Sequence, residues 1–368
     1  MINQRLGSFR LGKQGIGLVF FALLGLGMLI SPMTSVGQSL ENEGTRCEYK
    51  PIHGAWYIGS ERGSYTFWAV ERDLTIIRDR LCANYIALQA NVYQQDKYSS
   101  DPQRDYRTVS DETLARVVGK VHNLGMKVVL LTPLRPDDGT WEGAIEPEHL
   151  AVWFRHWEEI LVHYAKFSEE HGVEVLLLGS ELPTLRGEPE RWKSIIEELR
   201  RHFSGKLSFS VNFWTNRSEF EEVLNMTQWE DLDYIGITGY FELTPFSSPS
   251  VGRLTEAWSS DLHDQNVLED LRALRDKHDK PVVFWEIGYQ SKDGTNTYPW
   301  NYLKHGDKDE GEQKDSWLAF LRAIGDKEWI DGYMIFAEQV GLPRDKSGYH
   351  GYNVIRKEAE TVFCNICG

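Results

Sequence analysis

Apolar residues recur along the chain in two alternating patterns, which predict strands and helices in turn. Short apolar runs are typical of strands buried on both faces. They alternate with segments in which apolar residues recur every three or four positions, as in amphipathic helices. The predicted strands cover residues 53–58, 84–92, 126–132, 173–182, 207–211, 233–240, 281–289 and 332–337. The predicted helices cover residues 67–82, 110–124, 146–171, 189–203, 218–226, 253–278, 311–324 and 354–363.

The clearest helix follows the third strand. It begins near Pro147, a residue suited to a first helical turn, and Gly172 ends it. Its large apolar residues recur at helical spacing: Leu150, Trp153, Trp157, Leu161, Tyr164 and Phe167. We interpret this aromatic stripe as the face that packs on the protein core.

Eight strand–helix units in succession predict a single-domain (β/α)8 TIM barrel over residues 49–368. The alternative is an open, doubly wound sheet. No glycine-rich dinucleotide loop follows the first predicted strand, which disfavours that alternative. In a TIM barrel, the catalytic groups lie at the carboxyl ends of the strands.

Composition and charge narrow the choice of partner. The 368 residues carry a formal net charge of -15, which argues against a nucleic acid or an anionic membrane surface. A neutral ligand fits better, and the 13 tryptophans serve either core packing or stacking on sugar rings. The composition therefore favours a neutral partner, such as a polysaccharide or oligosaccharide. We also expect no metal or other cofactor, and a monomer.

The N-terminus resembles a secretory signal. Arg5, Arg10 and Lys13 precede an apolar run over residues 15–30, and small residues at 35–37 suit a cleavage site. We predict a signal peptide over residues 1–37, a linker over 38–48, and a secreted or periplasmic location. The alternative is an uncleaved membrane anchor, because the run approaches the length that spans a bilayer.

The four cysteines of the mature chain are Cys47, Cys82, Cys364 and Cys367. An exported protein favours disulfides, and four cysteines allow three pairings. A zinc site remains open because Cys364 and Cys367 are spaced as CxxC. The first three cysteines all map to the bottom of the predicted barrel, away from the catalytic end, where a bridge would stabilise the fold.

Two glutamates end predicted apolar strands. Glu181 ends the fourth strand and Glu286 lies at the tip of the seventh. A buried carboxylate is costly unless it is hydrogen-bonded or has chemistry to perform. Hydrolysis of a glycosidic bond requires two such groups, one to protonate the leaving oxygen and one to attack the sugar. We predict that this pair is catalytic; the alternative is that each glutamate only pairs with a basic side chain.

Other polar and aromatic residues at predicted strand ends belong to the same predicted cleft. Tyr240 ends the sixth strand, where its hydroxyl could orient Glu286 and keep it ionised. The remaining residues that we expect to line the cleft are Asn212, Trp214, Gln94, Trp56 and Tyr57.

Several motifs resemble glycoside hydrolases of clan A, and within that clan family 113, the small barrel β-mannanases. The motifs are Gly179-Ser180-Glu181-Leu182, residues 233–240, Phe284-Trp285-Glu286-Ile287-Gly288-Tyr289, residues 139–145, residues 153–172 and Pro299-Trp300. The resemblance implies retention of configuration, with Glu181 as acid/base, Glu286 as nucleophile and Tyr240 supporting the nucleophile. It also implies that Ser180, Trp141, Trp285 and Trp300 contact the sugar.

Three positions depart from the pattern of the clan. Ser180 replaces an asparagine that contacts the sugar 2-hydroxyl, Arg135 follows Pro133-Leu134 where a histidine is expected, and Phe336 stands in the segment that commonly provides a stacking tryptophan. The changes affect the walls of the cleft and not the two glutamates. We therefore expect a retaining endo-β-1,4-mannanase; the alternatives are another β-1,4-glycanase, an exo-β-mannosidase, or a barrel that binds carbohydrate without turnover.

Overall fold

The computed structural model describes residues 50–364 except 60–62, 64, 66–67, 304 and 342–350. Arg46–Gly368 form one compact unit. The predicted signal peptide and linker, together with Cys47 and Cys367, lie outside the described residues. Within the part that is described, no helix combines the length and apolar character needed to cross a membrane.

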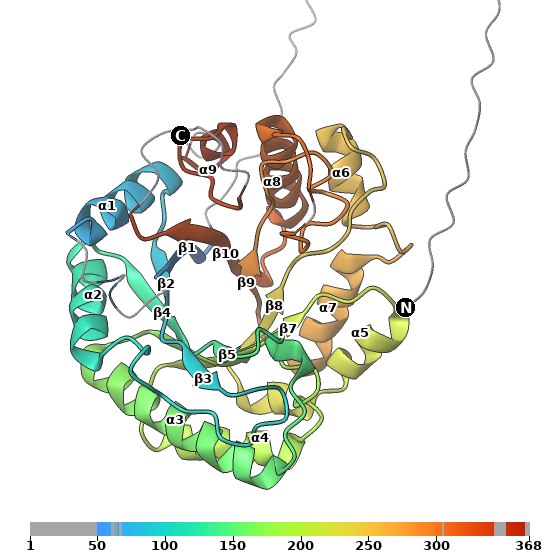
Figure 1. The fold of residues 1–368 in the computed structure, drawn as a ribbon. Helices are drawn as coiled ribbons and strands as arrows, with labels where there is room; N and C mark the ends of the chain where they lie inside the picture. The colour runs from blue at the N-terminus through green and yellow to red at the C-terminus, as the bar shows by residue number, and fades with distance from the viewer. Residues whose placement is uncertain are drawn as a thin grey trace, which may run out of the picture. The chain divides into compact units, whose positions relative to one another are not determined.

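Eight parallel strands close into a barrel, as the sequence predicts, and helices surround it (Figure 1). The order of the strands around the barrel is β1-β10-β9-β8-β7-β6-β4-β2. The strands are β1 (Ile52–Ile58), β2 (Tyr85–Gln89), β4 (Lys127–Leu131), β6 (Val175–Ser180), β7 (Lys206–Asn212), β8 (Tyr234–Thr238), β9 (Val282–Ile287) and β10 (Ile330–Gln339). The fold is a TIM barrel.

The helices that flank the barrel are α1 (Val70–Leu81), α2 (Asp111–Asn123), α3 (Leu150–His171), α4 (Pro189–Arg200), α5 (Arg217–Leu224), α6 (Val251–Ala257), α7 (Val267–His278), α8 (Glu310–Ile324) and α9 (Thr361–Cys364). Short 3-10 turns are η2 (Glu142–Ala144), η3 (Thr227–Asp231) and η4 (Glu358–Glu360). The aromatic stripe of α3 is core, as predicted: Trp153 and Trp157 are fully buried and their rings stack at 5.1 Å.

Alternate residues of the barrel strands face two separate cores. Trp56 belongs to the cluster inside the barrel, whereas the next residue, Tyr57, belongs to the cluster between strands and helices. Alternation of this kind follows from the two-residue period of a strand. The carboxyl ends of all eight strands meet at one rim, so side chains distant in sequence converge there.

Two predicted helices differ from the structure. The helical region 253–278 is divided into α6 and α7, because Asp261 bonds the backbone amides of His263 and Gln265 and so stabilises a turn between them. The predicted final helix over 354–363 is reduced to η4 and the short α9. Arg356 has a φ of 67°, and this left-handed conformation interrupts a right-handed helix at that residue.

A small second sheet extends the barrel on one side. The short strands β3 (Val92–Gln94) and β5 (Leu134–Pro136) are parallel and continue the directions of β2 and β4. The sequence analysis did not predict β5, because Pro133 and Pro136 disfavour a strand in a single sequence. The extension raises one wall of the barrel mouth.

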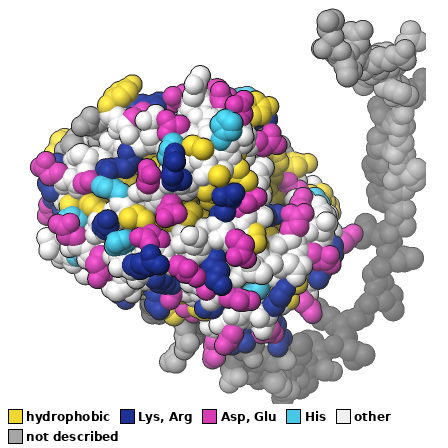
Figure 2. All heavy atoms as spheres, turned by 90° about the horizontal axis from the view of Figure 1, so that it is seen from below, with side chains coloured by type: hydrophobic (Ala, Val, Ile, Leu, Met, Phe, Trp, Pro, Cys, Tyr) yellow, Lys and Arg dark blue, Asp and Glu magenta, His cyan; other side chains and the backbone are white. Residues whose placement is uncertain are grey.

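Charges of both signs are interspersed on the face of the molecule shown in Figure 2, and that face carries no broad basic patch. This distribution agrees with the negative net charge of the chain. It is unlike the basic surface that phosphate contacts require.

A disulfide joins Cys82, at the end of α1, to Cys364, in the last helix. The bridge links residues 282 positions apart and thereby ties the first helix of the barrel to the last. One bridge at the bottom of the barrel was the expectation from the sequence, which left the pairing open.

We expect Cys82→Ser and Cys364→Ser each to lower the free energy of unfolding by about 2–5 kcal/mol, because the long closed loop restricts the unfolded chain. Turnover at 25 °C should not change, since the bridge lies at the opposite end of the barrel from the mouth. Thermal unfolding with and without reductant measures the effect, and equal melting temperatures in the wild type would contradict it.

Candidate active site

Glu181 follows β6 directly and occupies an unusual backbone conformation. Its φ of 53° lies in the left-handed region, which is unfavourable for a residue with a side chain. A hydrogen bond of 3.1 Å from its amide to the carbonyl of Ser210 on β7 helps to hold it there. Such strain costs about 1–3 kcal/mol and is concentrated at functional sites. The conformation turns the glutamate into the mouth.

Glu286 reaches the mouth because β9 is irregular. Phe284 faces the helices and Trp285 faces the interior of the barrel, so strict alternation would turn Glu286 outward. The pairing of β9 with both neighbouring strands shifts register at this point, as in a β-bulge. Glu286 consequently lines the pocket beside the interior-facing Trp285. Bulges often re-aim side chains next to active sites.

One pocket at the barrel mouth contains both glutamates. The tips of β2, β4, β6 and β9, with the loop after β4, supply most of its walls. The lining residues are Gln89, Leu131, Thr132, Pro133, Leu134, Arg135, Glu142, Trp157, Gly179, Ser180, Glu181, Leu182, Glu286 and Phe336. The structure thus brings together two carboxyl groups that are far apart in the sequence.

Each glutamate accepts a hydrogen bond from an aromatic side chain. The hydroxyl of Tyr240 donates to Glu286 Oε1 at 2.5 Å, and Trp141 Nε1 donates to Glu181 Oε2 at 3.1 Å. The Trp141 ring lies directly over Gly143, where a Cβ would come within 2.2 Å of the indole. Glycine at 143 is therefore required for Trp141 to reach Glu181.

Burial and mutual repulsion hold protons on the pair. Burial and the nearby Glu181 raise the pKa of Glu286 to about 8, although the Tyr240 hydrogen bond opposes the change. Burial and the nearby Glu142 likewise raise the pKa of Glu181. Two carboxyl groups that share a site cannot both ionise easily, so the pair keeps one proton at neutral pH.

The family model of glycoside hydrolase family 113 matches residues 55–355. This range contains both glutamates and all the barrel strands except the first three residues of β1. The chain belongs to glycoside hydrolase family 113. A comparison with curated protein sequences finds no significant match.

Solved structures support the fold of this family 113 glycoside hydrolase. A structure described as a complex of a family 113 β-1,4-mannanase aligns with a TM-score of 0.75 at 20% identity, covering 87% of this chain and 99% of that one. The family 113 β-mannanase AaManA from Alicyclobacillus acidocaldarius, in complex with ManMIm, gives a TM-score of 0.74 at 23% identity, covering 88% and 99%. The exo-β-1,4-mannosidase Op5Man5 from Opitutaceae bacterium strain TAV5 gives 0.56 at 13%, covering 86% and 59%.

Other residues that the sequence analysis placed in the cleft of this enzyme lie in or near the mouth. Ser180 lines the pocket next to Glu181. Asn212 ends β7 and is half-buried, and it pairs in register with Thr238 on β8. Trp300 is 44% exposed on the loop after β9. Their roles toward a sugar stay predictions.

Two predicted cleft tryptophans are instead part of the barrel interior. Trp56 donates from Nε1 to the carbonyl of Trp285 at 2.6 Å, and Trp285 donates to Ser208 Oγ at 2.7 Å. Both rings are buried among the residues that fill the barrel. The prediction was wrong because a residue near the end of a barrel strand can point down the axis as well as up into the mouth.

Three more predicted cleft residues have structural roles. Trp214 is buried against the Phe241 ring, at 5.0 Å between centroids, and Tyr57 faces the helices. Gln94 is 2% exposed and accepts a hydrogen bond from Trp153 Nε1 at 3.0 Å. Each faces away from the barrel axis, on the side where helices or loops cover the strand.

The structure adds residues that the sequence analysis did not assign to the site. Glu142 lines the pocket and lies 3.2 Å from Arg135, which the sequence analysis placed in the cleft wall. Tyr352 packs its ring on Tyr240 and Phe336, at 5.9 and 5.5 Å between centroids. No motif signals Tyr352, because it lies in a long loop after β10 whose path depends on tertiary contacts.

We expect kcat/KM to follow a bell-shaped pH profile that falls above about pH 8, where the pair loses its last proton.

Tyr240→Phe removes a hydrogen-bond donor that favours the ionised form of Glu286. It should therefore shift the acid limb to higher pH and lower kcat about ten- to hundredfold, the value of a hydrogen bond to a charged group. An unchanged acid limb in this variant would contradict the role of Tyr240.

The raised pKa of Glu286 also predicts how stability depends on pH. The folded protein keeps a proton that the unfolded chain releases above about pH 4.5, so stability falls as the pH rises from there through about 8. We expect Glu286→Gln to raise the free energy of unfolding at pH 9 by about 2–4 kcal/mol relative to its effect at pH 5. Denaturant unfolding at the two pH values measures this difference, and an equal effect at both would contradict it.

Proposed function

We propose that this protein is an exported, retaining β-1,4-mannanase in which Glu181 is the acid/base and Glu286 the nucleophile. The observation that carries the proposal is the pocket in which both half-buried carboxyl groups meet, with Tyr240 donating to Glu286 and Trp141 donating to Glu181. The short hydrogen bond from the Tyr240 hydroxyl favours charge on Glu286, while the nearby Glu142 raises the pKa of both glutamates.

In the first step the shared proton lies on Glu181 and the charge on Glu286. A carboxylate oxygen of Glu286 attacks the anomeric carbon, and the bond from that carbon to the leaving oxygen breaks. Glu181 gives its proton to that oxygen, so the leaving chain departs as a neutral alcohol. The product is a glycosyl ester on Glu286.

In the second step Glu181 acts as a base. Esterification removes the charge of Glu286, so the pKa of Glu181 falls and the side chain can accept a proton. Glu181 takes a proton from water while the water oxygen attacks the anomeric carbon and the ester bond breaks. Glu286 becomes a carboxylate again, Glu181 is reprotonated, and the sugar has the configuration of the substrate.

The substrate assignment rests on the family and on its solved members. The family 113 structures that align over nearly their whole length are described as β-mannanases. Arg135 and Phe336 line the pocket at positions where the wider clan commonly has other residues, so another β-1,4-glycan is the alternative substrate. An exo-acting mannosidase is a second alternative, and a binding protein without turnover a third.

Export is part of the proposal on three grounds. The first 37 residues have the pattern of a signal peptide, and the Cys82–Cys364 bridge suits an oxidising compartment. A polymeric glycan is also too large to enter a cell intact. We propose a secreted or periplasmic enzyme.

We expect Glu286→Ala and Glu181→Gln to lose most activity on galactomannan or glucomannan. General acid catalysis alone contributes on the order of 10²–10⁴-fold. On an aryl mannoside with a good leaving group, Glu181→Gln should keep a fast first step, because that oxygen needs no proton. Hydrolysis assays with both substrate types measure the difference.

A panel of galactomannan, glucomannan, cellulose oligomers and xylan tests the substrate, and NMR of the first product anomer tests retention. Near wild-type activity of Glu181→Gln on an unactivated glycan would overturn the acid assignment. If neither the wild type nor Glu286→Ala hydrolyses any glycan of the panel and both still bind sugar, the protein is a carbohydrate-binding barrel without turnover.

A further inference from the structure

Tyr240, which donates to Glu286, packs against two other aromatic rings. Its ring centroid lies 6.4 Å from that of Phe336 and 5.9 Å from that of Tyr352. The centroids of Phe336 and Tyr352 are in turn 5.5 Å apart, so the three rings contact one another in pairs. The rings meet edge-on or tilted, as aromatic pairs prefer. The loop after β10 thus contributes one side chain, Tyr352, to the support of the ring that bonds Glu286.

The hydroxyl of Tyr352 is engaged elsewhere. It donates to the carbonyl of Pro299 at 2.5 Å and accepts from Gln290 Nε2 at 3.1 Å. A phenol has one hydrogen, so this hydroxyl does not donate to Glu286 at the same time. The contact through which Tyr352 acts on the glutamate pair is therefore its ring, which packs on Tyr240.

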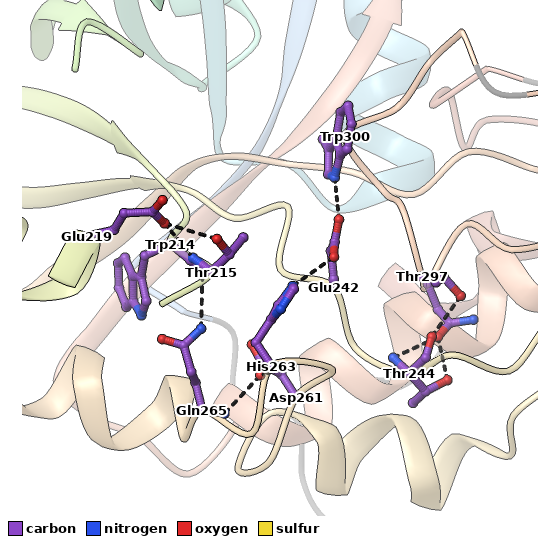
Figure 3. Close-up of polar contacts among 11 residues, drawn as sticks. Trp214, Thr215, Glu219, Glu242, Thr244, Asp261, His263, Gln265, Thr297 and Trp300 are labelled. Atoms are coloured by element: carbon purple, nitrogen blue, oxygen red, sulfur yellow. Dashed lines mark hydrogen bonds and ion pairs between the residues drawn. The ribbon is translucent and has the colours of Figure 1, made fainter. Parts of the chain in front are cut away.

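The loop after β9, which provides the anchor for this hydroxyl, is bonded to the loop that carries Tyr240 (Figure 3). Thr297 Oγ1 donates to the carbonyl of Thr244 at 2.7 Å. Trp300 Nε1 donates to Glu242 Oε1 at 2.7 Å. Both acceptors lie on the loop after β8, as Tyr240 does, and the anchor carbonyl lies between the two donors in the sequence. The two loops therefore hold the anchor in a fixed relation to Tyr240.

The backbone around Tyr352 is also bonded to the barrel. The carbonyl of Tyr352 accepts from Gln313 Nε2 at 3.4 Å. The amides of Val354 and Ile355 both donate to Glu338 Oε1, at 2.7 and 3.1 Å. Glu338 lies on β10 and is fully buried. The ring of Tyr352 is therefore fixed at its hydroxyl and through the backbone that carries it.

A glycine beside the end of β9 leaves room for this ring. A Cβ on Gly288 would lie 2.9 Å from Tyr352 Cδ1 and 2.5 Å from the carbonyl oxygen of Phe336. Both distances are too short for non-bonded heavy atoms, so a larger residue at 288 would displace the ring and the strand beside it. Gly288 follows Glu286 by two positions. The segment that delivers the glutamate thus also keeps the space for Tyr352.

Closure of the loop after β10 does not by itself require the contact between the Tyr352 and Tyr240 rings, because the hydroxyl and the backbone of Tyr352 already make the closing bonds. The hydrogen bond of 2.5 Å from Tyr240 to Glu286, in contrast, depends on the direction of its hydroxyl. Such a bond to a charged acceptor is about twice as strong as one between neutral groups. A ring packed between two others has few orientations open to it.

Glu286 also faces charged groups from other elements of the mouth. Glu181 after β6 and Glu142 in η2 disfavour its ionised form, whereas Arg135 on β5 favours it. These groups come from segments other than the loop after β10. Their effect on Glu286 therefore remains when Tyr352 is replaced.

We propose that Tyr352 is a positioning residue for the nucleophile: its ring holds Tyr240 in the orientation that bonds Glu286. The proposal rests on the proposed function, since it takes Glu286 as the group that must ionise to attack. It assigns to the last loop of the barrel a part in keeping the charge on Glu286.

¹³C NMR of the glutamate side-chain carboxyls measures the ionisation of Glu286 without a substrate. The parent is the full chain with Glu181→Gln, in which Glu286 titrates without its acidic partner. The signal that disappears on adding Glu286→Gln belongs to Glu286. We expect Tyr240→Phe and Tyr352→Ala each to raise the pH at which this signal titrates by about one pH unit, since a hydrogen bond to the charged form is lost.

The combination of Tyr352→Ala with Tyr240→Phe shows whether the effect passes through Tyr240. We expect no further change in the titration, because the bond that Tyr352 protects is already absent. Tyr352→Phe should titrate like the parent, since it keeps the ring. Tyr352→Leu keeps most of the buried volume and replaces Tyr352→Ala if that variant does not fold.

Tyr164→Ala is the matched control for loss of a packed tyrosine. Tyr164 is fully buried on α3, and its hydroxyl accepts from Arg104 Nε at 3.2 Å. We expect this variant to lower the melting temperature and to leave the titration of Glu286 unchanged.

Each outcome decides for or against the proposal. An unchanged or lower titration pH in Tyr352→Ala overturns it. A change of the same size in the Tyr240→Phe background, in Tyr352→Phe or in Tyr164→Ala also overturns it, because the effect would then come from water entry, from the hydroxyl or from lost stability. Turnover of the wild type on the glycan panel is a separate measurement, so an inactive wild type refutes the proposed function while the titration still decides on Tyr352.

Discussion

Two half-buried carboxyl groups in one pocket are the constraint on which the rest of this site depends. Each is costly to ionise away from water, and the nearby charge of the other raises the cost. The result is a pair that holds one proton near neutral pH, with the pKa of Glu286 raised to about 8. A glycosidase with retention of configuration needs this state, because one group must attack while the other protonates.

The two glutamate side chains are chemically identical, but the hydrogen bonds that they accept differ. Tyr240 donates a hydrogen bond of 2.5 Å to Glu286, whereas Glu181 accepts a longer one, of 3.1 Å, from Trp141. These contacts come from four different loops or strands of the barrel. A closed barrel with a rigid interior can hold such contacts in register, whereas isolated loops could not.

Local departures from regular geometry deliver both glutamates. Glu181 has a left-handed backbone immediately after β6, and Glu286 follows a register shift in β9. A regular strand would have turned Glu286 toward the helices. The energy of these irregularities is offset by the packed barrel around them, since the interior is filled by large side chains such as Trp56 and Trp285. The packed interior of the barrel therefore contributes to the geometry of the glutamate pair.

Much of the architecture was predictable from the sequence. Buried strands and amphipathic helices have distinct periods, so the eight repeating units and the positions of Glu181 and Glu286 near strand ends followed from pattern alone. The motifs around these glutamates also indicated the family that the family model confirms.

The directions of the tryptophan side chains, in contrast, depended on the tertiary structure. Trp141, on the loop before η2, reaches Glu181, whereas Trp56, Trp214 and Trp285 are buried in the core. The physical reason is that the direction of a side chain at a strand end depends on bulges and on partners from distant loops, and neither leaves a periodic signal. The same reason explains why Tyr352 and the Glu242 support of Trp300 could be found only in the folded chain.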